Sequence, residues 1–165
     1  MDLIKVIELH ANLVKTHLVE DGESKYQNSF ELALDLGQPF IERIAHPHRL
    51  KKRDCFPNCL ILAINNEDYH YCEGFAQVPG LGGLPFHHAW LLDDNGGVID
   101  PTWHEDSYIG TQYYGVPIST CYAVECTENS EWYGVISYPD SLINGIPLEF
   151  LKTIQAPLAG VLSKC

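Results

Sequence analysis

Between residues 54 and 151 the chain has no lysine or arginine, although this stretch holds fourteen aspartates and glutamates. All ten basic residues lie at positions 5–53, 152 or 164, and the net charge is −12. Nucleic acids and anionic lipids bind through a basic face. The charge pattern therefore argues against nucleic-acid and membrane partners. The one basic cluster, at 49–53, is either a solvated loop or a positive field that favours a thiolate or steers an acidic partner.

Long apolar runs and a secretory leader pattern are also missing. No apolar stretch approaches the length of a membrane span, and the first five residues lack the basic-then-apolar layout of a signal peptide. We therefore expect a cytoplasmic protein, inside a host cell if it is viral. In that compartment the six cysteines, at 55, 59, 72, 121, 126 and 165, are expected to be reduced.

The 165 residues, 45% apolar and 19% charged, fit one folded domain. Its expected parts are a helical N-terminal region (1–50), a core (54–118) and a C-terminal completion (119–165). The expected fold class is α+β, with a cysteine-bearing helix packed on an antiparallel sheet. Periodicity and capping signals predict helices at 3–19, 30–36, 55–65 and 147–154, and strands at 69–77, 87–92, 98–100, 112–118 and 133–138.

Cys55 is the candidate nucleophile. It is expected to be the first residue of a helix capped by Asp54, with Pro57 in the first turn, where proline is tolerated. Unpaired N–H groups and the helix dipole at such a terminus stabilise a thiolate. Cys59 lies one turn further in, where a thiol behaves as a small apolar group. Cys72 lies in the middle of an expected strand and is interpreted as structural.

A histidine must serve as the base, and two are adjacent. His87 and His88 face opposite sides of a strand, so only one can point at Cys55. A hairpin loop with an odd number of residues places position 88 on the same sheet face as Asp100, whereas a two-residue Asn95-Gly96 turn separates them. The spacing favours His88 as base and Asp100 as its orienting acid. Asp100 could alternatively cap a turn.

Four further residues are candidates for substrate binding: Asn58, Glu73, Trp90 and Trp103. Glu73 is a lone acid in an apolar strand and either lines the site or bonds to backbone. Each of the two tryptophans is interpreted as a core residue in preference to a substrate-binding surface. The oxyanion hole would use the Cys55 backbone N–H and a second donor, for which Asn58 and Gln38 are hypotheses.

Four short motifs lie in order within residues 54–103: Cys-Phe-x-Asn, Glu-Gly-x-Ala, His-Ala-Trp and Asp-Pro-Thr-Trp. This stretch resembles the transglutaminase-like branch of the papain-like cysteine fold. It is also similar to small bacterial and phage proteins that carry all four motifs. The resemblance implies a papain-like core and a triad of Cys55, His88 and Asp100. Such families include transglutaminases, deamidases, proteases, amidases and inactive members.

The leading expectation is a cysteine-dependent acyl-transfer enzyme that acts on a carboxamide or peptide bond of a protein or peptide. It would need no metal and no cofactor. The alternative is a catalytically silent binding module, such as a viral or bacterial inhibitor, on the same fold. A structural zinc protein that uses Cys55, Cys59, Cys72 and a histidine is a third class, but this spacing fits known zinc sites poorly.

Overall fold

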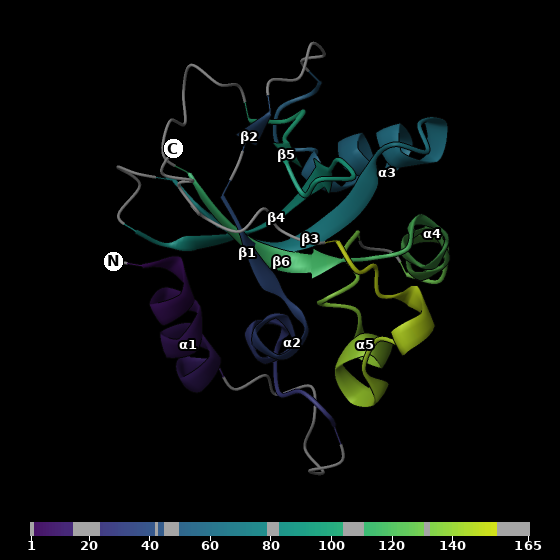
Figure 1. Cartoon of the computed structure of the whole chain (residues 1–165). Helices are drawn as coiled ribbons and strands as arrows, with labels where there is room; N and C mark the ends of the chain where they lie inside the picture. The colour runs from purple at the N-terminus through teal and green to yellow at the C-terminus, as the bar shows by residue number, and fades with distance from the viewer. Residues whose placement is uncertain are drawn as a thin grey trace, which may run out of the picture.

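A computed structural model of the chain describes residues 2–14, 24–41, 43–44, 50–78, 83–103, 111–130 and 133–154. These residues form a curled six-stranded sheet and five α-helices, so the α+β prediction is confirmed (Figure 1). No helix of the described residues combines the length and apolarity needed to cross a bilayer.

The strand order in the sheet is β1-β6-β3-β4-β5-β2. The strands are β1 (Gln38–Phe40), β2 (Arg43–Ile44), β3 (His70–Gln77), β4 (Pro85–Leu92), β5 (Val98–Ile99) and β6 (Gln112–Pro117). All neighbours are antiparallel except β2 and β5, which are parallel. The helices are α1 (Leu3–Leu13), α2 (Ser29–Leu36), α3 (Cys55–Asn65), α4 (Thr120–Glu128) and α5 (Pro139–Asn144).

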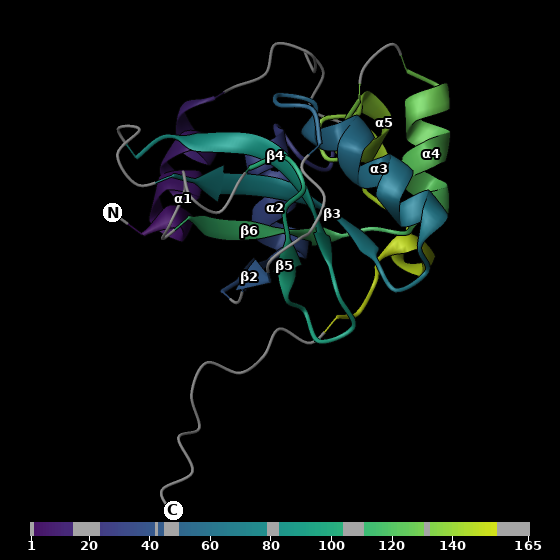
Figure 2. The same cartoon turned by 90° about the horizontal axis from the view of Figure 1, so that it is seen from above.

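The two faces of the sheet have different cover. One face, here called the helix face, carries Tyr71 and Phe75 of β3 and Ala89 of β4, and residues of all five helices pack on it. The second face carries Cys72 and Trp90 and packs without helices in its buried cluster. Figures 1 and 2 place α3 and α4 at one end of the sheet and α1 at the other. The start of α3 lies against the part of β4 that β5 does not pair. It therefore contacts both faces of β4: Phe56 packs against His87 of the helix face, and Cys55 interacts with His88 of the second face.

The hairpin between β4 and β5 has a five-residue loop, 93–97. Leu91 pairs with Ile99 and Leu92 with Val98, and the Asp93 carboxylate accepts hydrogen bonds from backbone N–H groups inside the loop. Because the loop length is odd, positions 88 and 100 share the second face. The condition for a His88–Asp100 pair is therefore met.

Helix boundaries were predicted well around the core and poorly at the start. The helix expected over 3–19 ends at Leu13, where Val14 turns to extended backbone; residues 15–19 lie outside the described part. Leu13 is 69% exposed, and the buried residues of α1 are Leu3, Val6 and Ile7. By contrast, α2 ends before Gly37 and α3 spans 55–65, as predicted.

The last third of the chain was predicted wrongly. The strand expected at 133–138 is a turn, and the helix expected at 147–154 is reduced to a 3-10 turn, Leu148–Phe150. The backbone N–H groups of Val135 and Ile136 bind the Glu73 carboxylate, not a neighbouring strand. The helices α4 and α5 and the strands β1 and β2 were not predicted. These elements depend on contacts distant in sequence.

Candidate active site

Cys55 is the first residue of α3 and is 8% exposed. No side chain caps this helix. Asp54, the expected cap, instead pairs with Lys51, with 2.6 Å between Nζ and Oδ2. Arg53, two residues before α3, has a left-handed backbone conformation, with φ 68°, which is uncommon for a non-glycine residue. The N-terminus of α3 therefore leaves the backbone N–H of Cys55 without a side-chain partner.

His88 and Asp100 meet on the second face, as predicted. The distance from His88 Nε2 to Asp100 Oδ2 is 2.8 Å, and neither side chain is more than 2% exposed. The ring of Trp103 stacks on His88, with centroids 3.9 Å apart and planes tilted by 13°. The Cys55 side chain interacts with the same histidine. The structure thus brings Cys55, His88 and Asp100 together.

These contacts shift the pKa values of both His88 and Asp100. Burial alone would lower the pKa of His88, but the charge and hydrogen bond of Asp100, and then the Cys55 side chain, outweigh it and raise the pKa to about 9. For Asp100, burial favours the protonated form, yet His88 and two backbone N–H groups hold its pKa below the ordinary value. At neutral pH the pair is therefore an imidazolium beside a carboxylate.

The Asp100 carboxylate is fixed by four donors. Besides His88, it accepts hydrogen bonds from the Tyr113 hydroxyl at 2.9 Å and from the backbone N–H groups of Thr102 at 3.0 Å and Trp103 at 2.9 Å. Buried carboxylates need such partners, because desolvation otherwise favours the neutral acid. Asp100 is thus a preorganised anchor for the histidine.

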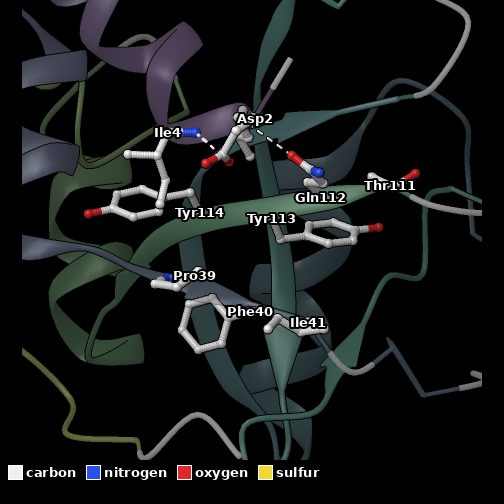
Figure 3. Close-up of a pocket in the computed structure, with 10 residues that line it drawn as sticks. Asp2, Ile4, Pro39, Phe40, Ile41, Thr111, Gln112, Tyr113 and Tyr114 are labelled. Carbon is white, nitrogen blue, oxygen red and sulfur yellow. Dashed lines mark hydrogen bonds between the residues drawn. The ribbon is translucent and has the colours of Figure 1, made fainter. Parts of the chain in front are cut away.

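Tyr113 is a member of this network that the sequence analysis missed. Its ring also lines a cavity of about 450 Å³ at the start of α1, between β1 and β6. Figure 3 shows Tyr113 and Tyr114 pointing to opposite sides of β6. Only β3 separates β6 from β4 in the sheet, and Tyr113 packs against Trp90 of β4 on the second face, so its hydroxyl reaches Asp100 across that face. Sequence spacing carries no signal for that neighbourhood.

Glu73 does not line the site. Its side chain is fully buried and accepts hydrogen bonds from the Tyr71 hydroxyl at 3.1 Å and the backbone N–H groups of Val135 and Ile136 at 2.7 and 3.1 Å. His87 Nε2 lies 2.8 Å from Oε1. The backbone-bonding interpretation therefore holds, and the substrate-binding assignment of Glu73 is corrected.

Asn58 is also engaged inside the protein. Its Nδ2 donates to the Lys51 carbonyl at 2.7 Å and to Thr102 Oγ1 at 3.0 Å. Both amide hydrogens are thus used to join α3 to the segments before it and after β5. In this structure Asn58 fixes the position of Cys55 relative to Asp100 and has no donor left for a substrate.

Of the remaining candidates, Trp103 lies at the site, whereas Trp90 is a core residue and Gln38 is remote. Trp90 is completely buried, so it is a core residue and not a substrate contact. Trp103 is half-buried, with its ring over His88 and edge-on to Phe86, which places it at the rim of the site. Gln38 lies on β1, three strands away from β4, and donates to the Ile154 carbonyl. It is not an oxyanion donor.

The remaining thiols differ from Cys55. Cys59 is fully buried and donates to the Ala89 carbonyl at 3.3 Å, and burial raises its pKa well above the ordinary value. Burial does the same for Cys72. The five described cysteines are free thiols. No group of three or more His, Cys, Asp or Glu side chains in the described ranges is arranged to hold a metal ion.

Comparisons of the chain with protein-family models, with curated proteins and with solved structures gave no match. The function is therefore argued from the geometry of Cys55, His88 and Asp100.

Proposed function

We propose that this chain is a cysteine-dependent acyl-transfer enzyme that acts on an amide of a protein or peptide. The supporting observation is the continuous contact from Cys55 to His88 to Asp100, with Cys55 at the N-terminus of α3. Thiol, imidazole and carboxylate in this order are the parts of an activated nucleophile. A helix-borne cysteine against an antiparallel sheet also fits the proposed papain-like, transglutaminase-like core.

The first half of the reaction forms a thioester. The Cys55 thiolate attacks the carbonyl carbon, and a C–S bond forms while the carbonyl π electrons move to oxygen. When the tetrahedral intermediate collapses, the C–N bond breaks and His88 gives its proton to the leaving nitrogen. Asp100 holds the ring through Nε2, so Nδ1 is the nitrogen that exchanges the proton.

The second half regenerates the enzyme. Water, or an amine, attacks the thioester carbon and loses a proton to the now neutral His88. The C–S bond breaks, and the product is a carboxylic acid or a new amide. The backbone N–H of Cys55 is the assigned donor to the developing oxyanion, because no side chain caps the start of α3. Its direction along the helix dipole adds to that stabilisation.

The charge around the site favours a neutral reacting group. No lysine or arginine occurs between residues 54 and 151, and Lys51, just before α3, is paired with Asp54. An anionic substrate group would therefore find no lysine or arginine from 54 to 151; the exposed Lys52 and Arg53, just before α3, give the start of the helix its basic side chains. A glutamine carboxamide or a peptide bond, in neutral or basic surroundings, fits this field.

The reactivity of the cysteines tests the nucleophile. Purified protein is treated with iodoacetamide at neutral pH, and each cysteine is followed by mass spectrometry. Cys121 is exposed on α4 and Cys59 is buried in α3, so they serve as internal references. Cys55 should react at least as fast as Cys121 despite its burial, and His88→Ala should slow Cys55 alone. Equal labelling of Cys55 in wild type and His88→Ala contradicts the assignment.

Turnover tests the reaction itself. Glutamine-containing peptides are incubated with the protein in chelator, and ammonia release and peptide cleavage are measured. Cys55→Ala should abolish both, whereas Cys59→Ala, one helical turn away, should keep most of the activity. A biological effect that persists in Cys55→Ala, without turnover by the wild type, would instead support the binding-module alternative.

A further inference from the structure

One arginine reaches the site from outside the stretch that lacks basic residues. Arg43 lies on β2, the edge strand that pairs in parallel with β5 (Figure 1). Its register partner is Val98, which belongs to the buried cluster of the second face. The next residue, Ile44, pairs with Ile99 and packs on the helix face. Strand alternation therefore places the Arg43 side chain on the second face, which also carries the proposed catalytic pair.

The guanidinium of Arg43 is engaged inside the protein. Its Nη2 donates a hydrogen bond to the backbone carbonyl of Trp103, and its Nε is buried. Burial, and then the charge of Asp100, raise the pKa of the Tyr113 hydroxyl, and the nearby Arg43 charge opposes them. A guanidinium withdrawn from water needs acceptors within the protein. The Trp103 carbonyl is therefore a specific partner of Arg43.

Contacts from several parts of the chain hold Trp103. Its backbone N–H donates to Asp100 Oδ1 at 2.9 Å, and its ring meets Phe86 of β4 edge-on, with centroids 6.3 Å apart. The hydrogen bond from Arg43 fixes the carbonyl of the same residue. The first two contacts come from the site itself, whereas the third ties Trp103 to β2, at the edge of the sheet.

The ring of Trp103 covers the histidine of the site. It stacks on His88 with centroids 3.9 Å apart and planes tilted by 13°. Trp103 is partly exposed whereas His88 is 2% exposed, so the indole lies between the imidazole and solvent. The face of an indole attracts a cation, and exclusion of water strengthens the hydrogen bond to Asp100. The stack therefore supports both the charge and the orientation of His88.

We propose that Arg43 is a positioning residue of the active site, which fixes the Trp103 carbonyl and thereby keeps the indole ring stacked on His88. The kinetic consequence rests on the proposed function, whereas the position of the ring is a property of the fold. Arg43 does not touch the reacting atoms and acts only through Trp103. A shift of the ring matters because a catalytic group displaced by about 1 Å can cost a large part of the rate.

Four variants isolate this role. Arg43→Met removes the donor and the charge but keeps an unbranched side chain, and Arg43→Lys keeps a charged donor. Gln38→Met is the matched control, because Gln38 lies on the other edge strand, β1, and also donates to a distant backbone carbonyl, that of Ile154. Trp103→Ala removes the ring but keeps the carbonyl that Arg43 binds. Combining it with Arg43→Met shows whether Arg43 acts through the ring.

The position of the ring is measured by NMR of protein with labelled histidine rings, in which His88→Gln assigns the His88 signals. Spectra are recorded at pH 5.5, below the ordinary imidazole pKa of about 6.5. A stacked indole shifts the His88 ring protons upfield. Arg43→Met should move them downfield, toward their position in Trp103→Ala, whereas Arg43→Lys should move them less and Gln38→Met not at all. Unchanged His88 signals in Arg43→Met overturn the proposal.

Turnover of benzyloxycarbonyl-glutaminyl-glycine measures the consequence. Arg43→Met should lower kcat about 10-fold with little change in KM, and Arg43→Lys should recover it to within about 3-fold of the wild type. Gln38→Met should keep the wild-type kcat.

In the Trp103→Ala background, Arg43→Met should cost less than about 2-fold more. A further loss of about 10-fold in that background would show that Arg43 acts without the ring, and would overturn the proposal. If the wild type shows no turnover that depends on Cys55, the proposed function fails, and the NMR signals alone decide the positioning role.

Discussion

Asp100 and Glu73 are two buried carboxylates with nearly the same surroundings. Each accepts hydrogen bonds from one histidine Nε2 at 2.8 Å, from one tyrosine hydroxyl, and from two consecutive backbone N–H groups. The histidines are neighbours, His87 and His88, and face opposite sides of β4. The same hydrogen-bonding arrangement thus occurs twice, around two neighbouring histidines of β4.

The two pairs differ in what the second nitrogen of each histidine meets. His88 is 2% exposed and interacts with the Cys55 thiol, whereas His87 is 28% exposed and packs against Phe56. The backbone donors also differ in origin: those of Asp100 come from the turn directly after it, and those of Glu73 come from a turn about sixty residues later. Asp100 therefore serves the proposed chemistry, and Glu73 mainly ties the C-terminal third to the sheet.

Replacing each carboxylate with its isosteric amide should give the largest difference between the Asp100 pair and the Glu73 pair. Asp100→Asn should lower kcat by about 100-fold or more, because the amide cannot hold the imidazolium in its orientation. Glu73→Gln should lower the free energy of unfolding by about 3 kcal/mol, because an amide NH₂ group would face backbone donors that need an acceptor. Turnover assays and urea unfolding of both variants measure this. The comparison is wrong if Glu73→Gln costs more activity than Asp100→Asn.

The pH dependence of the free energy of unfolding should show that His88 and Asp100 form an ionised pair. The pKa of His88 is raised to about 9 in the folded protein, so its contribution is fully present below the unfolded value of about 6.5 and is lost as pH rises to about 9. The expected loss is on the order of 3 kcal/mol. The lowered pKa of Asp100 adds a separate loss below about pH 4.

Urea unfolding at pH 6.5 and pH 9 checks this window. The wild type should be less stable at pH 9, and His88→Gln should remove most of the difference between the two pH values. A wild-type stability that rises between them, or an unchanged difference in His88→Gln, would contradict an imidazolium at this position.

Removal of either tyrosine hydroxyl should give the smallest effects, and these effects should differ between the Asp100 pair and the Glu73 pair. Tyr113 donates to Asp100 at 2.9 Å and Tyr71 donates to Glu73 at 3.1 Å. Tyr113→Phe should lower kcat about 5-fold by loosening Asp100, with KM unchanged, because one of four donors is lost. Tyr71→Phe should cost about 1.5 kcal/mol of stability with a smaller change in kcat. Equal kcat values for the two variants would show that the tyrosines do not distinguish the pairs.

Several features of the site were predictable because they depend on short stretches of chain. The start of α3 at Cys55 follows from an Asp-Cys-Phe-Pro sequence, although Asp54 turned out to pair with Lys51 and not to cap the helix. The placement of His88 and Asp100 on one face follows from strand alternation and an odd loop. Which loop the chain would adopt was left open by the sequence and was decided by the turn around Asp93.

Other features depended on contacts that no local pattern encodes. Glu73 was equally compatible with a site wall and with backbone bonding until Val135 and Ile136 were found to donate to it. The same two residues suggested a strand, because they are apolar and β-branched. Their N–H groups are satisfied by a carboxylate, so they form a turn.

The sequence by itself determined the α+β class and the helix that begins at Cys55, and it predicted that His88 and Asp100 meet on the condition that the loop between them has an odd length. The helix and the pair depend on neighbours within about a dozen residues, through Pro57 in the first turn of α3 and the two-residue period of a strand. Only the tertiary structure decided that Asn58 and Trp90 are internal, that Tyr113 joins Asp100, and that His87 has a carboxylate of its own. Those outcomes depend on strand order and on long-range donors, and burial makes every polar group find a partner wherever the fold supplies one.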